Sequence, residues 1–187
     1  MKKILVIGSC GAGKSTFARR LHKHIGLKLI HLDSFYHKPN WEEPSEEEWL
    51  AVVNKLVEDD EWIMDGNFGG TMDLRLRFCD TVIRLDFPRI VCTWRVIKRT
   101  LKYYKRKRPD MAEGCKERFD WEFLKYVWNF SRDENPSIES RLLKFEDVKI
   151  FNLQSDREVE DFFAELKNQQ STPPIISKKK KNEMPND

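Results

Sequence analysis

The chain reads Gly8-Ser9-Cys10-Gly11-Ala12-Gly13-Lys14-Ser15 close to its N-terminus. A glycine, four residues and then Gly-Lys-Ser make the Walker A pattern. The apolar run Ile4–Ile7 precedes the pattern, and Phe17, Leu21 and Ile25 follow it at helical spacing. We therefore predict a buried strand, a glycine-rich turn and a helix that begins near Lys14.

Such a loop is suited to hold the phosphates of a nucleoside triphosphate. Glycines allow a turn whose backbone N–H groups face a phosphate, and the helix N-terminus adds partial positive charge. We expect Lys14 to reach the β- and γ-phosphates and the Ser15 hydroxyl to ligate Mg²⁺. Cys10 is interpreted as a small filler rather than a nucleophile. The candidate residues for binding ATP in this loop are Gly8, Ser9, Cys10, Gly11, Ala12, Gly13, Lys14, Ser15 and Thr16.

Strand-like and helix-like patterns alternate along the rest of the chain. Apolar runs predict further strands at 29–32, 62–64, 81–85 and 148–153. Helices are predicted after Ser45, from about Pro88, over 120–132 and after Ser155, and residues 34–44 are predicted to form a loop. The alternation is typical of an α/β domain built on a parallel sheet.

Carboxylates end three of the predicted strands, and ligands of open parallel sheets bind beyond the carboxyl ends of the strands. We expect Asp65 to orient Mg²⁺ or its waters, because hard cations prefer oxygen ligands; the alternative is an Asp that caps the turn at Gly66. Asp33 is the candidate to align an acceptor hydroxyl or take its proton, with loop capping as the alternative. Asp86 is expected to cap the following helix. His31 and His37 flank Asp33, and either could line a substrate pocket.

A basic segment runs from Lys98 to Arg108, where seven of eleven residues are Lys or Arg and none is acidic. We interpret it as a mobile lid, because it ends in a break at 109–114 that could act as a hinge. Arginines neutralise charge on a transferred phosphoryl group, and the candidates are Arg75, Arg77, Arg99, Arg106 and Arg108. The alternative is a nucleic-acid-binding patch with Tyr103 and Tyr104 as stacking surfaces.

Length and composition limit the number of domains and the kinds of partner that we expect. The chain has 187 residues and a net charge of +3, which suggests one domain and argues against a surface that is basic throughout. We expect the folded domain over 1–168 and a disordered Lys-rich tail over 169–187. The four cysteines lack C-x-x-C spacing, and no apolar stretch is long enough for a signal peptide or a membrane span. We expect a cytoplasmic protein with reduced thiols, monomeric or homodimeric.

Further motifs resemble the adenylate-kinase-like branch of P-loop kinases, and more closely the bacterial family known as DNA topology modulation proteins. Beyond the glycine-rich loop, the resemblance rests on His31-Leu32-Asp33 with Asn40-Trp41, on 62–68, on 80–86 with Pro88-Arg89, and on 106–114. It covers roughly residues 1–167 of the chain.

The resemblance implies a P-loop three-layer sandwich. Its five-stranded parallel sheet would have the order 2-3-1-4-5, with a small helical lid over about 102–118. It also implies ATP and Mg²⁺ as cofactors, lid arginines that close over the phosphates, and an arginine beside the lid, here Arg99, that stacks on adenine. The chain departs from adenylate kinases after Asp65-Gly66, where Asn67-Phe68-Gly69-Gly70 replaces Phe-Pro-Arg. Arg75 or Arg77 could substitute for that arginine, and AMP is disfavoured as the acceptor.

The main hypothesis is a Mg²⁺- and ATP-dependent kinase of a small nucleoside, nucleotide or similar metabolite. Its candidate catalytic residues are Lys14, Asp33, Arg106 and Arg108, and its candidate metal ligands are Ser15 and Asp65. The alternative is an ATP-regulated nucleic-acid-binding protein without metabolite kinase activity, which would use the basic segment and the tail. The sequence leaves the acceptor, and ATP versus GTP, open.

Overall fold

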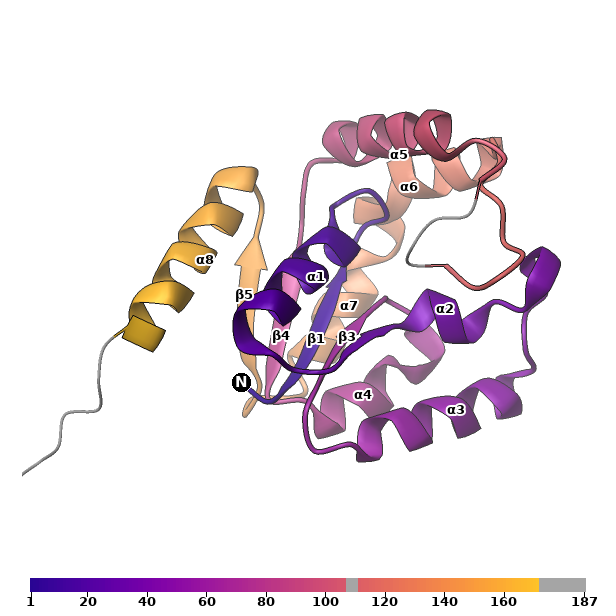
Figure 1. Cartoon of the computed structure of the whole chain (residues 1–187). Helices are drawn as coiled ribbons and strands as arrows, with labels where there is room; N and C mark the ends of the chain where they lie inside the picture. Colours follow the sequence, from indigo (N-terminus) through magenta and orange to yellow (C-terminus); the bar gives the residue numbers. More distant parts are fainter. Residues whose placement is uncertain (107–110, 172–187) are drawn as a thin grey trace, which may run out of the picture. The chain divides into compact units, whose positions relative to one another are not determined.

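The apolar run near the N-terminus forms the central strand of a parallel sheet. The computed structural model describes residues 1–106 and 111–171. In it β1 (Lys3–Gly8) pairs with β3 (Trp62–Asp65) on one side and β4 (Thr81–Leu85) on the other. β2 (Leu29–His31) pairs with β3, and β5 (Lys149–Leu153) pairs with β4. The resulting order, β2-β3-β1-β4-β5, confirms the predicted topology (Figure 1).

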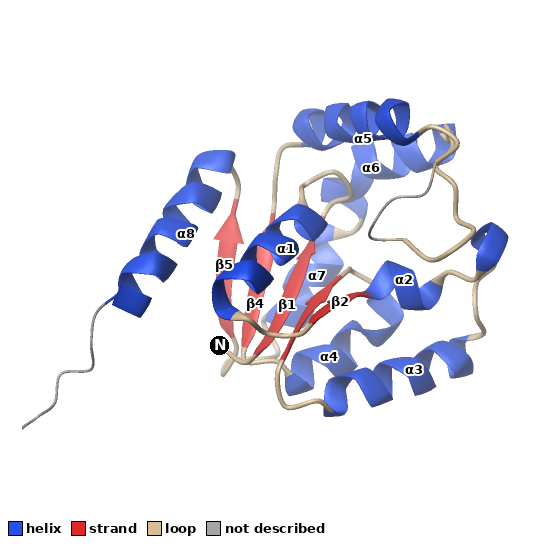
Figure 2. Ribbon diagram, viewed as in Figure 1, coloured by secondary structure: helices blue, strands red, loops and turns tan. Residues whose placement is uncertain are grey.

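Helices cover both faces of this sheet, because alternate side chains of a strand point to opposite faces. α1 (Lys14–Ile25) packs on one face against β1, β2 and β3. On the other face, Leu5, Ile7 and Trp62 belong to a core that they share with α3 (Glu46–Glu58), α4 (Met72–Phe78), α6 (Trp121–Asp133) and α7 (Asn135–Leu142). Figures 1 and 2 show α1 in front of the sheet and α7 behind it, the predicted three-layer arrangement.

Local signals placed the longer helices correctly. Gly26 ends α1 in the left-handed conformation, and the Ser45–Glu48 capping box begins α3. α5 (Arg89–Tyr103) follows Pro88, and Asp120 caps α6 by accepting a hydrogen bond from Phe123 N–H at 2.9 Å. These signals depend on neighbouring residues only, which explains why the sequence reveals them.

The shorter helices were missed. The segment predicted as a loop over 34–44 contains most of α2 (Leu32–Tyr36) and a 3₁₀ helix, Pro39–Trp41. A second 3₁₀ helix, Gly69–Thr71, leads into α4, and α7 was also not predicted. Helices of one or two turns offer too few apolar positions for periodicity to reveal them.

The predicted lid is described only in part. Residues 102–106 and 111–118 comprise the last residues of α5 and a non-helical segment with turns. Lys105 N–H donates to the Glu117 carbonyl and Glu117 N–H donates to the Arg106 carbonyl, each at 2.9 Å, which ties the two parts together. Arg108 lies outside the described residues.

The chain divides into two compact units, Met1–Ser155 and Asp156–Asp187. The second unit contains α8 (Asp156–Ser171), which begins at the predicted place. α8 continues to Ser171, so residues 169–171, which we expected in the tail, belong to this helix. The rest of the tail lies outside the described residues. Among the described residues, no helix is long and apolar enough to cross a membrane.

Candidate functional site

The loop between β1 and α1 has the backbone that its glycines allow. Gly8 and Gly11 have φ angles of +136° and +84°, a region that favours glycine. A Cβ atom at Gly8 would collide with the Leu85 carbonyl, and one at Gly11 with the Cys92 carbonyl. α1 begins immediately afterwards at Lys14, whose Nζ donates to the Ser9 carbonyl at 3.1 Å. Close packing and backbone conformation therefore both require glycine in this loop.

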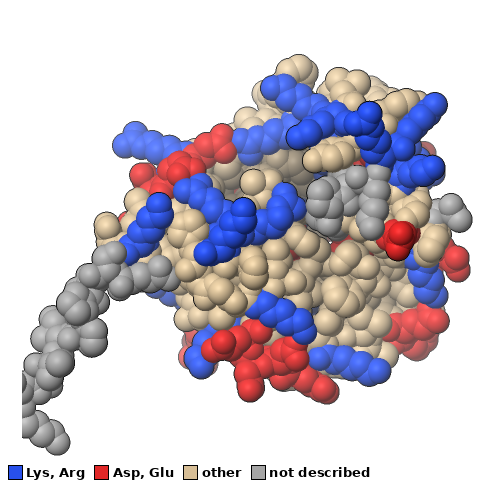
Figure 3. Space-filling model, in the orientation of Figure 1, with Lys and Arg blue, Asp and Glu red and all other residues tan. Residues whose placement is uncertain are grey.

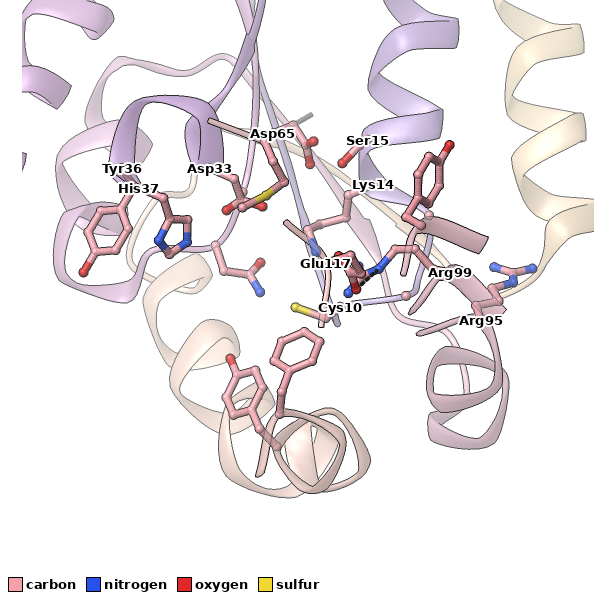
Figure 4. A pocket seen from close by; sticks show the side chains of 18 of the residues that line it. Cys10, Lys14, Ser15, Asp33, Tyr36, His37, Asp65, Arg95, Arg99 and Glu117 are labelled. Atoms are coloured by element: carbon pink, nitrogen blue, oxygen red, sulfur yellow. Dashed lines mark ion pairs between the residues drawn. The ribbon is translucent and has the colours of Figure 1, made fainter. Parts of the chain in front are cut away.

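The loop opens onto a cavity of about 1190 Å³. The cavity brings together most of the residues that we predicted to act on a ligand: Cys10, Gly11, Gly13, Lys14, Ser15, Thr16, Asp33, Asp65 and Arg99. Figure 4 shows the side chains of Asp33 and Asp65 on the same side of Lys14, with Ser15 nearby. Three loop residues, Gly8, Ser9 and Ala12, are buried and do not line the cavity. Arg106 is exposed and does not line it either, so its role in closing a lid stays a prediction.

Asp65 ends β3 at the floor of the cavity and is 5% exposed. Its Oδ2 lies 2.8 Å from Nδ1 of His31, while its Oδ1 has no hydrogen-bond partner among the described residues. A buried carboxylate oxygen without a partner is costly unless a ligand satisfies it. Together with the Ser15 hydroxyl in the same cavity, it fits Mg²⁺, which usually takes few protein ligands and completes its shell with phosphates and water. No cluster of three or more His, Cys, Asp or Glu side chains suited to a metal occurs in residues 1–106 and 111–171.

Asp33 enters the cavity from the first turn of α2 rather than from a loop. The prediction for Asp86 is wrong, because the N-cap of α5 is Pro88 and no side chain caps that helix. Asp86 instead accepts a hydrogen bond from the Asn135 amide at 3.0 Å and lies 3.4 Å from the Arg84 guanidinium. Asp86 therefore contacts α7 and β4 instead of beginning α5.

Cations of α5 line one side of the cavity: Arg95, Lys98, Arg99 and Lys102. Figure 3 shows Lys and Arg side chains gathered over α5. Arg99 is held by buried Glu117, with Nε 3.4 Å from Oε1, and Thr100 donates to the same carboxylate at 3.0 Å. Arg95, which sequence reasoning missed, donates to the Ala12 carbonyl of the glycine-rich loop at 3.3 Å. It lies four residues, one helical turn, before Arg99, and that spacing is a signal that could have identified it.

Neither proposed substitute for the adenylate-kinase arginine reaches the cavity. Arg75 is completely buried and donates hydrogen bonds to the carbonyls of Thr71, Gly66, Asn67 and Phe68. Burial lowers its pKa to about 9, which leaves it a cation at neutral pH. Arg77 is exposed and does not line the cavity. The suggestion that Arg75 or Arg77 contacts the acceptor is therefore wrong, and Arg75 holds the backbone of 66–68 in place.

Asn67 links that segment to the glycine-rich loop. Its Oδ1 accepts from Gly8 N–H and its Nδ2 donates to the Gly8 carbonyl, both at 2.9 Å. Gly66 N–H also donates to the Val6 carbonyl at 3.2 Å. The departure from the adenylate-kinase pattern thus supplies a side chain that fixes the start of the phosphate-binding loop.

Aromatic side chains line the cavity beside Asp33. The ring centroid of Tyr36 lies 4.7 Å from that of Phe68, and His37 and Trp41 are 5.2 Å apart in an edge-on arrangement. The Tyr36 hydroxyl donates to Glu43 Oε2 at 3.2 Å, and the pKa of Tyr36 is raised, first by burial and then by Glu43. On α6, burial raises the pKa of Tyr126, which therefore stays a neutral hydroxyl.

The segment after 110 contacts this aromatic side. Trp41 Nε1–H donates to the Lys116 carbonyl at 3.2 Å, and Cys115 Sγ lies 3.3 Å from the Lys38 carbonyl oxygen. The Trp41 ring packs against Met111, Ala112 and Cys115. The described part of the predicted lid thus forms part of the cavity rim.

Solved structures similar in fold to this chain include kinases. Shikimate kinase from Acinetobacter baumannii in complex with shikimate superposes with a TM-score of 0.58 at 13% identity, over 92% of this chain and 96% of that one. Shikimate kinase from Bacteroides thetaiotaomicron gives 0.51 at 17% identity, over 90% and 98% of the two chains. Deoxyadenosine kinase from M. mycoides gives 0.50 at 14% identity, over 89% and 98%. At these identities the likeness establishes a P-loop kinase fold.

Comparison by sequence adds nothing to this. No protein-family model matches the chain, and no curated protein matches it significantly.

Proposed function

We propose that the protein is an ATP- and Mg²⁺-dependent kinase that transfers the γ-phosphoryl group to a small metabolite. The observation that carries the proposal is the shared cavity: the glycine-rich loop with Lys14 opens onto the same space as the carboxylates of Asp33 and Asp65. A phosphate-binding loop alone requires only a nucleotide. A kinase also needs a group that can receive a proton from the attacking hydroxyl of the acceptor, and a carboxylate in the same cavity supplies one.

Each residue has a distinct role in this proposal. Lys14 and the loop amides hold the β- and γ-phosphates, while Ser15 and Asp65 hold Mg²⁺. Bound Mg²⁺ neutralises phosphate charge. Asp33 aligns the acceptor hydroxyl and takes its proton as the oxygen bonds to the γ-phosphorus and the bond to ADP breaks. Arg95 and Arg99 stabilise the negative charge on the donor phosphates.

Two further observations support a kinase. Shikimate kinase and deoxyadenosine kinase, which share the fold, are by name kinases of small molecules. Of the basic segment, Lys98, Arg99 and Lys102 line the cavity, so their charge faces the ligand space of the loop. The rival, binding to nucleic acid, predicts affinity that falls steeply with salt and is lost when Lys105 and Arg106 are neutralised.

The decisive test is Lys14→Ala, assayed with γ-labelled ATP and a panel of nucleosides, nucleotides and sugars as acceptors. We expect ATP affinity to fall at least tenfold and phosphoryl transfer to be lost, because the substitution removes the ammonium that we propose holds the β- and γ-phosphates. Lys23→Ala, an exposed lysine on the same helix, is the matched control. Unchanged ATP affinity and turnover in Lys14→Ala would refute the proposed function.

A further inference from the structure

Two sides of the cavity differ in the side chains that line them. One side carries the α5 cations Arg95 and Arg99, and Figure 4 shows both across Lys14 from Asp33, Tyr36 and His37. Lys14 and Arg19 belong to α1, next to the phosphate-binding loop. A triphosphate therefore finds its counter-charges on the α5 and α1 sides.

The opposite side, which we call the acceptor side, consists of Asp33, Tyr36, His37, Trp41, Glu43 and Phe68. Five of its members form one contact network. Tyr36 contacts His37, Phe68 and Glu43, and His37 contacts Trp41. With Asp33, which lines the same cavity, the acceptor side combines planar rings with two carboxylates.

The carboxylates restrict the acceptor. A phosphate group carries between one and two negative charges at neutral pH. Asp33 would repel it, and Glu43 would do so more weakly because it is exposed. Carboxylates instead accept hydrogen bonds from hydroxyl and amino groups. Arg75 and Arg77, the cations that could have held an acceptor phosphate, are excluded because neither lines the cavity.

Arg118 is a cation of the lining that lies beside the acceptor side. The guanidinium of Arg118 is 6.0 Å from the centre of the Trp41 ring. It is exposed and belongs to the segment after residue 110. An exposed arginine is a weak phosphate site, because solvent screens its charge.

The aromatic rings indicate what the acceptor carries besides its hydroxyl groups. Large apolar faces that line a cavity bind planar rings by stacking and by exclusion of water. A sugar or a short polyol would use the carboxylates but would not stack on these rings. A planar ring joined to a hydroxylated group uses both.

Resting on the kinase function above, we propose that the phosphoryl acceptor is a nucleoside, with a planar base, sugar hydroxyls and no phosphate. The base stacks among Tyr36, Trp41 and Phe68, and Glu43 receives hydrogen bonds from base or sugar. A sugar hydroxyl faces Asp33. The products are a nucleoside monophosphate and ADP, with the hydroxyl proton passed to Asp33 and then to solvent.

The test compares the purified full-length protein on ribo- and deoxyribonucleosides, their 5′-monophosphates and ring-free polyols, with γ-labelled ATP. We expect kcat/KM for at least one nucleoside to exceed that for its monophosphate and for every polyol at least tenfold. A monophosphate or a polyol as the better acceptor overturns the inference but leaves the kinase function standing. Absence of ATP binding by the wild-type protein refutes the kinase function itself.

Variants at the rim connect this preference to the named residues. Glu43→Lys should lower the ratio of nucleoside to monophosphate kcat/KM at least tenfold and leave the KM for ATP within twofold. Glu42→Gln, an exposed neighbour that does not line the cavity, is the control. An unchanged ratio in Glu43→Lys, or loss of monophosphate transfer in Arg118→Ala with nucleoside transfer retained, overturns the assignment of the acceptor side as one without a phosphate site.

Discussion

Asp33 is the residue that we expect to act in phosphoryl transfer but not in ATP binding. It lies in the first turn of α2 and lines the cavity. Asp33→Asn preserves its size and removes the group that accepts a proton. We expect kcat to fall by about 10²–10⁴-fold, the usual worth of a general base, while ATP affinity stays within twofold. Equal losses in kcat and ATP affinity, measured by steady-state kinetics and calorimetry, would assign Asp33 a structural role.

Cys10 offers a chemical probe of the same loop. Burial raises the pKa of the Cys79 thiol to about 12 and also raises that of Cys92, and Cys115 is buried too. At pH 8 about one Cys79 thiol in 10⁴ is the reactive thiolate, since its pKa lies about four units higher. Cys10 is only partly buried and lines the cavity. Iodoacetamide should therefore modify Cys10 first, and Mg²⁺-ATP should protect it.

Peptide mapping by mass spectrometry checks this order of labelling. Denatured protein, in which all four thiols should react, is the control. Labelling of Cys79 in the folded protein as fast as Cys10, or no protection by Mg²⁺-ATP, would contradict the prediction.

At the scale of elements, α4 supports the segment that follows β3. Arg75 donates from this helix to four carbonyls at 66–71. Arg75→Leu leaves them without a donor, and each buried unsatisfied group costs about 1–3 kcal/mol. We expect the free energy of unfolding to fall by about 3 kcal/mol or more, measured by urea denaturation. The exposed Arg77→Leu on the same helix should change it by less than about 0.5 kcal/mol.

Arg75→Leu also tests whether the segment after β3 is coupled to the phosphate-binding loop. The Asn67 side chain accepts a hydrogen bond from Gly8 N–H and donates one to the Gly8 carbonyl. A shift of residues 66–68 should therefore also move the phosphate-binding loop. Arg75→Leu protein that remains folded should bind ATP more weakly than wild type. If it keeps wild-type stability, the account of Arg75 as the support of this segment is wrong.

At the scale of the whole molecule, ligand binding and stability are linked. A ligand at 100 times its dissociation constant stabilises the native state by about 2.7 kcal/mol, which raises Tm by about 5–10 °C in a protein of this size. We expect Mg²⁺-ATP to produce such a shift and ATP with EDTA a smaller one. The difference should shrink in Asp65→Asn, since that variant replaces the carboxylate whose buried Oδ1 has no hydrogen-bond partner among the described residues.

Differential scanning calorimetry measures both shifts. Asp147→Asn, an exposed carboxylate that does not line the cavity, should keep the Mg²⁺-dependent difference. A full difference in Asp65→Asn would remove Asp65 from the metal site.

The sequence by itself determined the β1–loop–α1 unit, the longer helices and, through resemblance, the order of the sheet. Glycine conformations, capping boxes and apolar periodicity act over a few residues, so they can be read locally. Only the tertiary structure decided which charged side chains face the cavity. It buried Arg75, brought Arg95 to the Ala12 carbonyl and paired Asn67 with Gly8, 59 residues away. Burial and pairing depend on surfaces that meet only after the sheet has formed, so helical spacing can suggest Arg95 as a candidate but does not specify its contact.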